Sequence, residues 1–276
     1  MNTEKIWLVT GASTGLGLVL VKMLLDQGHK VAATSRDFDA LLDAVGAKLE
    51  GRFLPLAVDL ADERNVRRAV DATMAAFGRV DVLVNSACHG LQGSLDSLSD
   101  AELRDSFDTH VFGALNVIRT VMPRMRAQRS GHVFNISSIL GFDGGSAEWG
   151  AYSAAKFAVS GLTETLAAEA APHGIRVSLV YPGAMRAVRP QAGAPGVSPE
   201  LAARNPRERE QGGDPAKVAQ ALINAAQAQY APLHLFLGRD SFDQARSKIQ
   251  SVQQELARWR EMSVSIGFVD ERRLAA

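Results

Sequence analysis

Short runs of β-branched and other apolar residues alternate with amphipathic stretches along most of the chain. The apolar runs predict buried strands at residues 6–10, 30–35, 53–58, 80–85, 132–136, 175–180 and 233–237. Apolar positions at helical spacing predict a helix that ends at Gly28, and further helices near residues 62–77, 100–128, 151–172 and 214–229. This alternation predicts a single-domain α/β fold, a doubly wound parallel sheet of about seven strands with helices on both faces. Ligands of such a sheet bind outside the carboxyl ends of its strands.

Residues 186–213 depart from this alternation. They are rich in proline, glycine and charge, and the run is longer than an ordinary connection. It predicts either a lid over the ligand site or plain disorder. We assign residues 1–240 to one domain that contains the catalytic site and this lid, and residues 241–276 to a C-terminal helical extension.

A heptad-like apolar seam marks the C-terminal helix. Its members follow one another alternately three and four residues apart: Phe242, Ala245, Ile249, Val252, Leu256 and Trp259. Most amphipathic helices cover apolar surface of their own domain, so we expect this seam to pack on the same subunit. A dimer contact is the alternative.

Composition narrows the range of partners. Lys plus Arg and Asp plus Glu each total 30, so the net charge is zero and there is no bulk attraction to nucleic acid or to acidic lipid. The one cysteine, Cys88, excludes an intramolecular disulfide and a cysteine-built zinc site, and we predict no metal. With no signal-peptide pattern and no apolar stretch long enough to span a membrane, we expect a cytoplasmic protein with a small-molecule substrate. A homo-oligomer, dimer or tetramer, remains open.

A glycine-rich turn lies between the first predicted strand and the first helix. Glycines there permit a tight turn and close approach of the backbone to a pyrophosphate, while the helix N-terminus supplies amide donors. This context predicts a Rossmann-type dinucleotide site. Its predicted ligand-binding residues are Gly11, Ser13, Thr14, Gly15, Leu16 and Gly17.

The end of the second strand indicates which dinucleotide binds. An acidic residue there would hydrogen-bond the adenosine ribose and repel a 2′-phosphate. This chain has Ser35 and Arg36 instead, a hydroxyl and a planar fork of donors that suit a phosphate. Asp37 could partly neutralise Arg36. We predict NADP(H) as the cofactor rather than NAD(H).

Tyr152 and Lys156 lie four residues apart, on one face of a predicted helix. A free phenol has a pKa of about 10, and a cation about 4 Å away, at an effective dielectric constant of 20, favours the phenolate by roughly 4 kcal/mol. Such a tyrosine can exchange a proton with a carbonyl oxygen near neutral pH. Pairs of this kind are common on solvated helices, but Ser138 follows a buried strand at the predicted ligand edge, where its hydroxyl could hold a substrate oxygen.

Taken together, these features resemble the short-chain dehydrogenase/reductase family, over about residues 5–185. The matching landmarks are residues 10–17, Asp59-Leu60, residues 85–87, Ser138, residues 152–156 and Pro182-Gly183. The tail from residue 214 through residues 237–240 is similar to a bacterial branch that carries an extra C-terminal helix.

The resemblance implies a role for each landmark. Tyr152 would be the general acid/base, Ser138 would orient the substrate oxygen, and Lys156 would bind the nicotinamide ribose and lower the pKa of the tyrosine. Further residues are implied to contact the cofactor at the adenine, along the cleft and at the nicotinamide: Asp59, Leu60, Asn85, Ala87, Pro182 and Gly183.

Four positions depart from the family pattern. Cys88 stands where a glycine is usual, Ala187 stands where a threonine is usual, and the loop between Ser138 and Tyr152 is one residue longer than is common. His110 occupies the place of the fourth catalytic residue, an asparagine. Two hypotheses for His110 follow: it relays protons toward Lys156 or the substrate, or it is a neutral, buried packing residue.

We therefore predict an NADPH-dependent carbonyl reductase, or alcohol dehydrogenase in reverse, for a lipophilic or aromatic ketone, aldehyde or secondary alcohol. Phe142, Trp149, Met185 and Val188 are candidates for the pocket wall, with core packing as the equal alternative. A dehydratase or epimerase on the same scaffold, or a nucleotide-binding regulator with impaired catalysis, are the competing functions.

Overall fold

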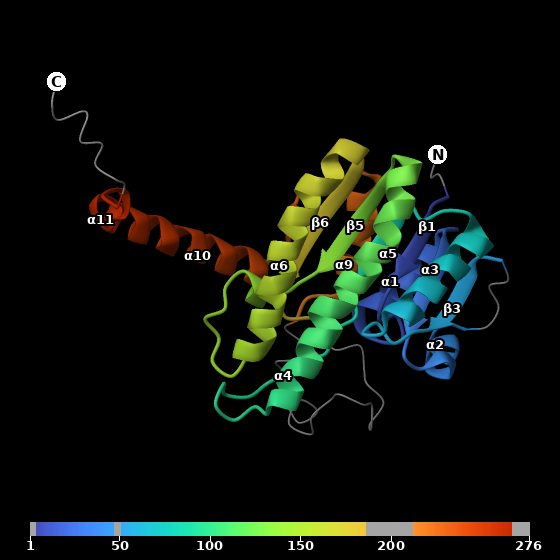
Figure 1. Ribbon diagram of the computed structural model, residues 1–276, viewed down its shortest axis with the longest axis horizontal. Coiled ribbons are helices and arrows are strands. Elements are labelled where there is room, and N and C mark those ends of the chain that lie inside the picture. The colour runs from blue at the N-terminus through green and yellow to red at the C-terminus, as the bar shows by residue number, and fades with distance from the viewer. Residues whose placement is uncertain (1–3, 47–50, 186–211, 267–276) are drawn as a thin grey trace.

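The sheet matches the predicted doubly wound fold. A computed structural model of the protein describes residues 4–46, 51–185 and 212–266. Seven strands form one parallel sheet in the order β3-β2-β1-β4-β5-β6-β7 (Figure 1). The strands are β1 (Ile6–Val9), β2 (Lys30–Ser35), β3 (Phe53–Ala57), β4 (Val82–Asn85), β5 (Gly131–Ile136), β6 (Ile175–Pro182) and β7 (His234–Leu237).

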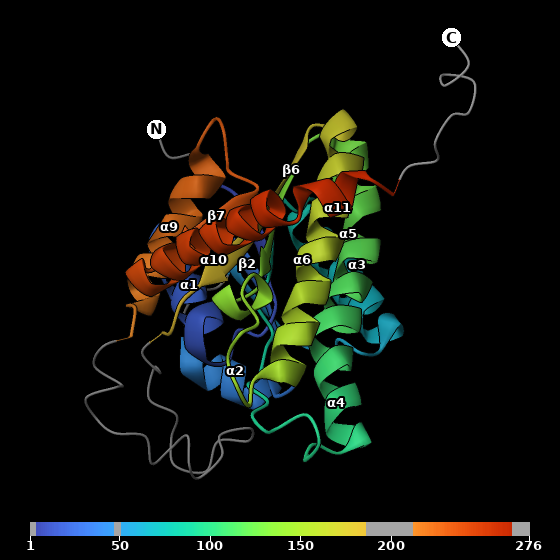
Figure 2. The ribbon, with the colours of Figure 1, turned by 90° about the vertical axis from the view of Figure 1, so that its left-hand side faces the viewer.

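Helices cover both faces of the sheet. Figure 2 shows α1 (Gly15–Asp26) and α9 (Pro215–Gln227) on one side, and α3 (Glu63–Phe77), α5 (Gly113–Gln128) and α6 (Gly150–Ala170) on the other. Side chains alternate across β1, so Trp7 and Val9 pack with α1 and α9 while Leu8 packs with α3 and α5. Strands buried on both faces are apolar at most positions, which is why they appear in the sequence as nearly continuous runs.

The helical stretch predicted at residues 100–128 is divided by a wider turn. It consists of α4 (Asp100–Phe107), a π-helical turn η1 (Asp108–Phe112) and α5. A π-turn inserts one residue into an α-helix and often marks a functional site. His110 lies on this turn. Helix α2 (Phe38–Val45) was not among the predicted helices, and short helical turns η2 (Ile139–Gly141) and η3 (Ala171–His173) flank α6.

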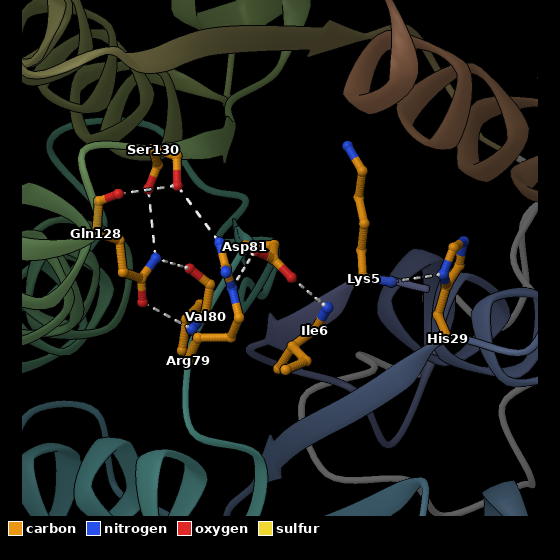
Figure 3. A network of polar contacts seen from close by, with 8 residues as sticks. All are labelled: Lys5, Ile6, His29, Arg79, Val80, Asp81, Gln128 and Ser130. Carbon is orange, nitrogen blue, oxygen red and sulfur yellow. Dashed lines mark hydrogen bonds and ion pairs between the residues drawn. The ribbon is translucent and has the colours of Figure 1, made fainter. Parts of the chain in front are cut away.

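A polar network closes the amino-terminal edge of the sheet (Figure 3). One carboxylate oxygen of Asp81 accepts a hydrogen bond from the Ile6 amide at 2.8 Å, and the other pairs with Arg79 Nε at 2.7 Å. The Gln128 side chain donates to the Val80 carbonyl at 2.8 Å and accepts from the Val80 amide at 3.2 Å. These bonds join β1, β4 and the end of α5 at the edge opposite the strands' carboxyl ends, so they stabilise the fold away from the ligand site.

The C-terminal helix differs from our expectation. Helix α10 (Arg239–Arg258) contacts β7 and η2, and it is followed by α11 (Arg260–Val264). Only Ser241 and Ala245 of α10 are buried. Beyond them the seam is exposed, and α10 leaves the body of the molecule in Figure 1. Packing on its own domain therefore holds for the first two turns alone, because no described part of the chain lies over the rest.

The structure says little about the predicted lid. The lid proposed at residues 186–213, together with Ala187 and Val188, lies outside the described residues except for Gly212 and Gly213. In the described ranges, no helix is both long enough and apolar enough to cross a membrane.

Candidate active site

A cavity opens at the carboxyl ends of β1, β4 and β5. Eleven residues line it: Thr10, Leu60, Asn85, Ala87, Thr109, His110, Ala114, Asn135, Ile136, Lys156 and Val159. Five of them are site residues that the sequence predicts, namely Leu60, Asn85, Ala87, His110 and Lys156. Residues from the ends of β1, β4 and β5, from the turn after β3 and from the helical segments η1, α5 and α6 thus meet where a doubly wound sheet binds its ligand.

The glycine-rich turn packs tightly against the end of β4. Gly11 has a φ of +67°, and a Cβ atom there would lie 2.4 Å from the Ala87 Cα, so only glycine fits. Thr10 Oγ1 accepts hydrogen bonds from the amides of Ser86 at 3.1 Å and Ala87 at 3.3 Å. A Cβ atom at Gly15 would meet no atom within 4 Å. The side of the turn that faces the end of β4 is therefore tightly packed, and the side at Gly15 is open.

The N-terminus of α1 is free to receive an anion. Thr14, its N-cap residue, makes no capping hydrogen bond with its side chain, and the first turn carries no acidic residue. By contrast, Asp37 caps α2, Asp62 caps α3 and Asp214 caps α9. Uncapped amides and the positive end of the helix dipole suit a pyrophosphate, which the predicted residues Ser13, Leu16 and Gly17 would flank.

A chain of side-chain amides forms the floor of the cavity. Asn85 Nδ2 donates to Asn135 Oδ1 at 2.8 Å, and Asn135 Nδ2 donates to Thr163 Oγ1 at 2.9 Å. Asn85 Oδ1 is buried and has no hydrogen-bond partner in the part of the chain that the structure describes. A buried acceptor without a partner is costly. It therefore favours a ligand with a hydrogen-bond donor, as a nicotinamide cofactor provides.

Arg36 is exposed at the end of β2, next to the glycine-rich turn. Among the described residues Asp37 forms no ion pair with it, and the Asp37 carboxylate accepts a hydrogen bond from the Ala40 amide at 2.9 Å as the cap of α2. The Ser35 hydroxyl accepts from the Asp37 amide at 3.2 Å. An exposed guanidinium without a direct ion pair to Asp37 suits an anionic ligand.

Asp59 and Leu60 follow β3, on the same edge of the sheet. The Asp59 carboxylate accepts a hydrogen bond from the Ala61 amide at 3.0 Å, and the Leu60 carbonyl accepts from Asn116 Nδ2 at 2.9 Å. These bonds hold a tight turn whose apolar residue, Leu60, lines the cavity. Such a surface suits the flat face of an adenine ring.

Ser138 and Tyr152 come together beside two residues that line the cavity, since the Tyr152 ring lies next to His110 and Lys156. Burial raises the pKa of Tyr152 above its ordinary value and the negative charge that Cys88 can carry raises it further, while a hydrogen bond with the Ser138 side chain opposes the rise. The phenol is therefore protonated at neutral pH. A serine hydroxyl beside a protonated phenol gives two groups that can bind one substrate oxygen.

Lys156 is buried, with 2% of its surface exposed. Its ammonium donates to the Ile136 carbonyl at 3.0 Å and lies 5.5 Å from the centre of the Tyr152 ring. Burial lowers the pKa of Lys156. Among the described residues no hydrogen bond joins the Lys156 ammonium to the Tyr152 hydroxyl, and Lys156 is not among the groups that shift the pKa of Tyr152. The hydrogen bond to the Ile136 carbonyl uses one of the three N–H donors of the Lys156 ammonium, and the other two can bind a ligand.

His110 is held between two other groups of the protein. Its Nε2 accepts from the His89 amide at 3.1 Å, so the proton of the neutral ring sits on Nδ1, which lies 3.2 Å from Ser106 Oγ. Burial and the Lys156 charge lower the pKa of His110 to about 2. The ring meets the Tyr152 ring edge-on, with centroids 5.6 Å apart. This geometry favours the packing hypothesis, since neither ring nitrogen is directed at Lys156 or Tyr152.

The pH dependence of activity tests the role of His110. Because its pKa lies near 2, the ring stays neutral, and we expect the shape of the kcat/KM profile between about pH 5.5 and 7.5 to be the same in wild type and His110→Asn. His110→Ala should be slower than His110→Asn, because it leaves the His89 amide without a partner. A limb near pH 6.5 in the wild type that disappears in His110→Asn would instead show proton transfer by the histidine.

The turn after β6 is clamped by the start of α10. The Gly183 amide donates to the Leu237 carbonyl at 2.9 Å, and the Ala184 amide donates to Asp240 Oδ2 at 2.8 Å. A Cβ atom at Gly183 would lie 2.1 Å from Asp240 Oδ1, so a larger residue there would displace the Asp240 carboxylate. Pro182 and Gly183 thus occupy a fixed position beside the cavity. Asp240 holds them there.

Several apolar side chains are candidates for a substrate pocket near Tyr152. Trp149 meets Tyr152 edge-on with centroids 5.6 Å apart, Leu95 lies next to Gly150, and Met185 is 37% exposed after β6. Phe142 instead packs with Tyr181 and other rings of the core. Of the predicted wall residues that the structure describes, Trp149 and Met185 therefore remain available for a substrate, and Phe142 does not.

Sequence reasoning missed several residues of this site. Asn135 could have been found as a polar residue inside an otherwise apolar strand, and Asp240 as an acidic residue two positions after a glycine that ends the last strand. Leu95 carries no signal in the sequence, because its position depends on how two loops pack together.

Comparison with known proteins gives matches to one family. The family model described as short chain dehydrogenase matches residues 5–192. Oxidoreductase BOA17 of Botryotinia fuckeliana is 30% identical over 271 residues, 95% of this chain and 98% of that protein. Retinol dehydrogenase 8 of Homo sapiens is 34% identical over 82% of this chain and 79% of its own length. A 3-ketodihydrosphingosine reductase of Bacteroides thetaiotaomicron is 41% identical over 65% of this chain and 63% of its own length.

Solved structures agree as well. A short-chain dehydrogenase from Streptomyces avermitilis superposes with a TM-score of 0.85 and 38% identity, covering 97% of this chain and 100% of that chain. One from Burkholderia cenocepacia, in complex with NADP, gives 0.74 and 26%, covering 94% and 98%. A 3-ketoacyl-(acyl-carrier-protein) reductase from Brucella melitensis, complexed with NADH, gives 0.73 and 24%, covering 84% and 96%, and shares the fold. The chain belongs to the short-chain dehydrogenase/reductase family of oxidoreductases.

Proposed function

We propose that this protein is an NADPH-dependent reductase of lipophilic or aromatic ketones and aldehydes, which also oxidises the corresponding secondary or primary alcohols. The observation that carries this proposal is the position of the Tyr152 phenol, beside the Ser138 hydroxyl and next to two residues that line the nucleotide cleft, His110 and Lys156. A phenol held protonated at neutral pH is already in the form that reduction needs, because a carbonyl oxygen must gain a proton as it becomes an alcohol.

In the proposed mechanism, Ser138 and Tyr152 both bind the substrate oxygen. When bound, NADPH supplies the hydride that the carbonyl carbon receives. Tyr152 gives its phenolic proton to the oxygen and is then reprotonated from solvent, so carbonyl, hydride and proton together yield the alcohol. Lys156 would bind the nicotinamide ribose through its remaining ammonium donors. His110 acts here as a positioning residue, since it packs against the Tyr152 ring and hydrogen-bonds the loop after β4.

The proposed substrate class rests on apolar side chains near Tyr152 and on the names of two relatives. Trp149 contacts the Tyr152 ring, Leu95 lies next to Gly150, which is in the same helix as Tyr152, and both Leu95 and Met185 are exposed. A lipophilic carbonyl compound would bury such surface, at roughly 25 cal/mol for each Å² removed from water. Two relatives are named for retinol and for 3-ketodihydrosphingosine, both lipophilic compounds.

A substrate screen tests the function. NADPH oxidation should be followed with aromatic ketones, long-chain 3-keto compounds and polyene aldehydes, and with short polar ketones as the contrast. We expect turnover with the lipophilic set and little with the polar set. Conversion of a substrate without net NADPH consumption would indicate a dehydratase or epimerase, and tight NADPH binding without any turnover would indicate a regulator.

The choice of cofactor depends on Arg36. We expect Arg36→Ala to raise the KM for NADPH about 10- to 100-fold and to leave the KM for NADH nearly unchanged, since a charge-assisted phosphate contact contributes roughly 1.5–3 kcal/mol. Arg36→Asp should reverse the preference, because a carboxylate repels the 2′-phosphate. The matched control is Arg67→Ala, which removes an exposed arginine of α3 that pairs with Glu63. Equal effects of Arg36→Ala on both cofactors would contradict the assignment.

A further inference from the structure

The apolar seam of α10 has no cover within the described residues. Ser241 and Ala245 are buried at its start, but every side chain from residue 246 to residue 266 is exposed. Leu256 is 63% exposed and Trp259 is 54% exposed. A single helix in water is only marginally stable, and a monomer rarely presents so long an apolar stripe to solvent. The seam therefore needs a partner.

The spacing of the seam makes it complementary to itself. Its six members stand in three pairs, each pair equally distant from the midpoint between Gln250 and Ser251: Phe242 with Trp259, Ala245 with Leu256, and Ile249 with Val252. When a second copy of the helix runs antiparallel about that midpoint, the exposed seam residues come opposite the other members of their pairs. The ring of Phe242 then faces Trp259 of the second copy and Ile249 faces Val252, whereas Ala245 is already buried by its own domain, so Leu256 of the second copy meets the surface beside it.

The charges beside the seam agree with this register. In the heptad pattern, Lys248 and Glu255 each stand directly before a seam residue, on the same flank of the helix. In an antiparallel pair these flanks face each other, so Lys248 of one copy lies opposite Glu255 of the other, and the reverse contact follows by symmetry. A membrane surface fits less well, since a helix that binds anionic lipid carries an excess of Lys and Arg. In α10 and α11, acidic and basic residues nearly balance.

We propose that two copies of this chain form a dimer through antiparallel pairing of their α10 helices. The first turn of α10 is tied to the body, because the Ser241 hydroxyl donates to the Tyr181 carbonyl at 2.7 Å and Gln244 Nε2 donates to Asp143 at 3.1 Å. The helix is therefore a rigid arm with a fixed base. In the dimer, the far end of each arm reaches the base of the other arm, beside the turn that Asp240 clamps.

Mass in solution tests the pairing. The wild-type protein should show at least twice the 29.5 kDa of one chain, and Ile249→Glu/Leu256→Glu should halve the mass. Because both side chains are exposed in the single chain, the melting temperature of the body and the binding of NADPH should be preserved. The matched control, Gln250→Glu/Gln254→Glu, adds the same charge outside the seam and should keep the wild-type mass. A monomeric wild type, or a seam variant with unchanged mass, would overturn the proposal.

Disulfide cross-linking tests the orientation. In a Cys88→Ser background, copies carrying Phe242→Cys are mixed with copies carrying Trp259→Cys and oxidised. The antiparallel register predicts a cross-linked dimer only in the mixture, because identical positions of the two copies stand about 25 Å apart at 1.5 Å per residue. Cross-linking of Phe242→Cys copies with one another would indicate parallel helices and would overturn this arrangement.

Discussion

Replacing Tyr152 with phenylalanine should lower kcat for carbonyl reduction by about 100- to 10,000-fold, the range that a positioned general acid contributes. The change removes one hydroxyl and keeps the ring that packs against His110 and Trp149. The binding of NADPH and the melting temperature should therefore stay close to the wild-type values. Initial rates at saturating NADPH, a cofactor titration and a thermal melt separate these three properties.

The control for this variant is Tyr230→Phe. Tyr230 is 85% exposed in the loop after α9, so the same hydroxyl is lost far from the cleft, and the rate should not change. A second expectation concerns direction. Since the pKa of Tyr152 is raised, reduction should not decline as the pH rises through neutrality, whereas alcohol oxidation needs the phenolate and should become faster toward alkaline pH. A Tyr152→Phe enzyme with near-wild-type reduction would remove Tyr152 from the mechanism.

The strands of the sheet are predictable because strands buried on both faces appear in the sequence as short runs of apolar residues. Every predicted strand lies within two residues of a strand in the structure, and the strand ends gather the landmark residues as expected. Helix α2 escaped prediction because Asp37 was interpreted only as a neighbour of Arg36, although it caps that helix. The π-turn at His110 escaped because an apolar pattern continues through one inserted residue.

The contacts within the site were less predictable than its members. A four-residue spacing puts Tyr152 and Lys156 on one helix face, but it does not reveal that the Ile136 carbonyl binds the ammonium. Likewise, a seam of apolar residues predicts that α10 covers something, and it cannot tell whether the covered surface belongs to the same subunit or to another. Both outcomes depend on the positions of groups that are distant in sequence, which local spacing does not encode.

Lowering the pH should destabilise this protein at pH values well above those at which its carboxylates take up protons, because several histidines are buried in their neutral form. Burial, as the main cause, lowers the pKa of His110 to about 2 and that of His132 to about 3, and it also lowers the pKa of His29 (Figure 3). In the unfolded chain a histidine has a pKa of about 6.5. Between these values the unfolded state binds protons that the folded state excludes, so stability is complete above about pH 6.5 and falls as the pH decreases.

The expected loss is large. At about pH 5, His110 and His132 should each lower the free energy of unfolding by roughly 2 kcal/mol, and together by roughly 4 kcal/mol, a substantial part of the 5–15 kcal/mol of an ordinary domain. Urea unfolding at about pH 7 and pH 5 measures this difference. His132→Gln, at the start of β5 and away from the cleft, should remove about half of it, since its side chain does not titrate. The control, His173→Gln, removes an exposed histidine and should leave the difference unchanged. If the wild type loses no stability between these two pH values, the buried rings are not held neutral by the fold.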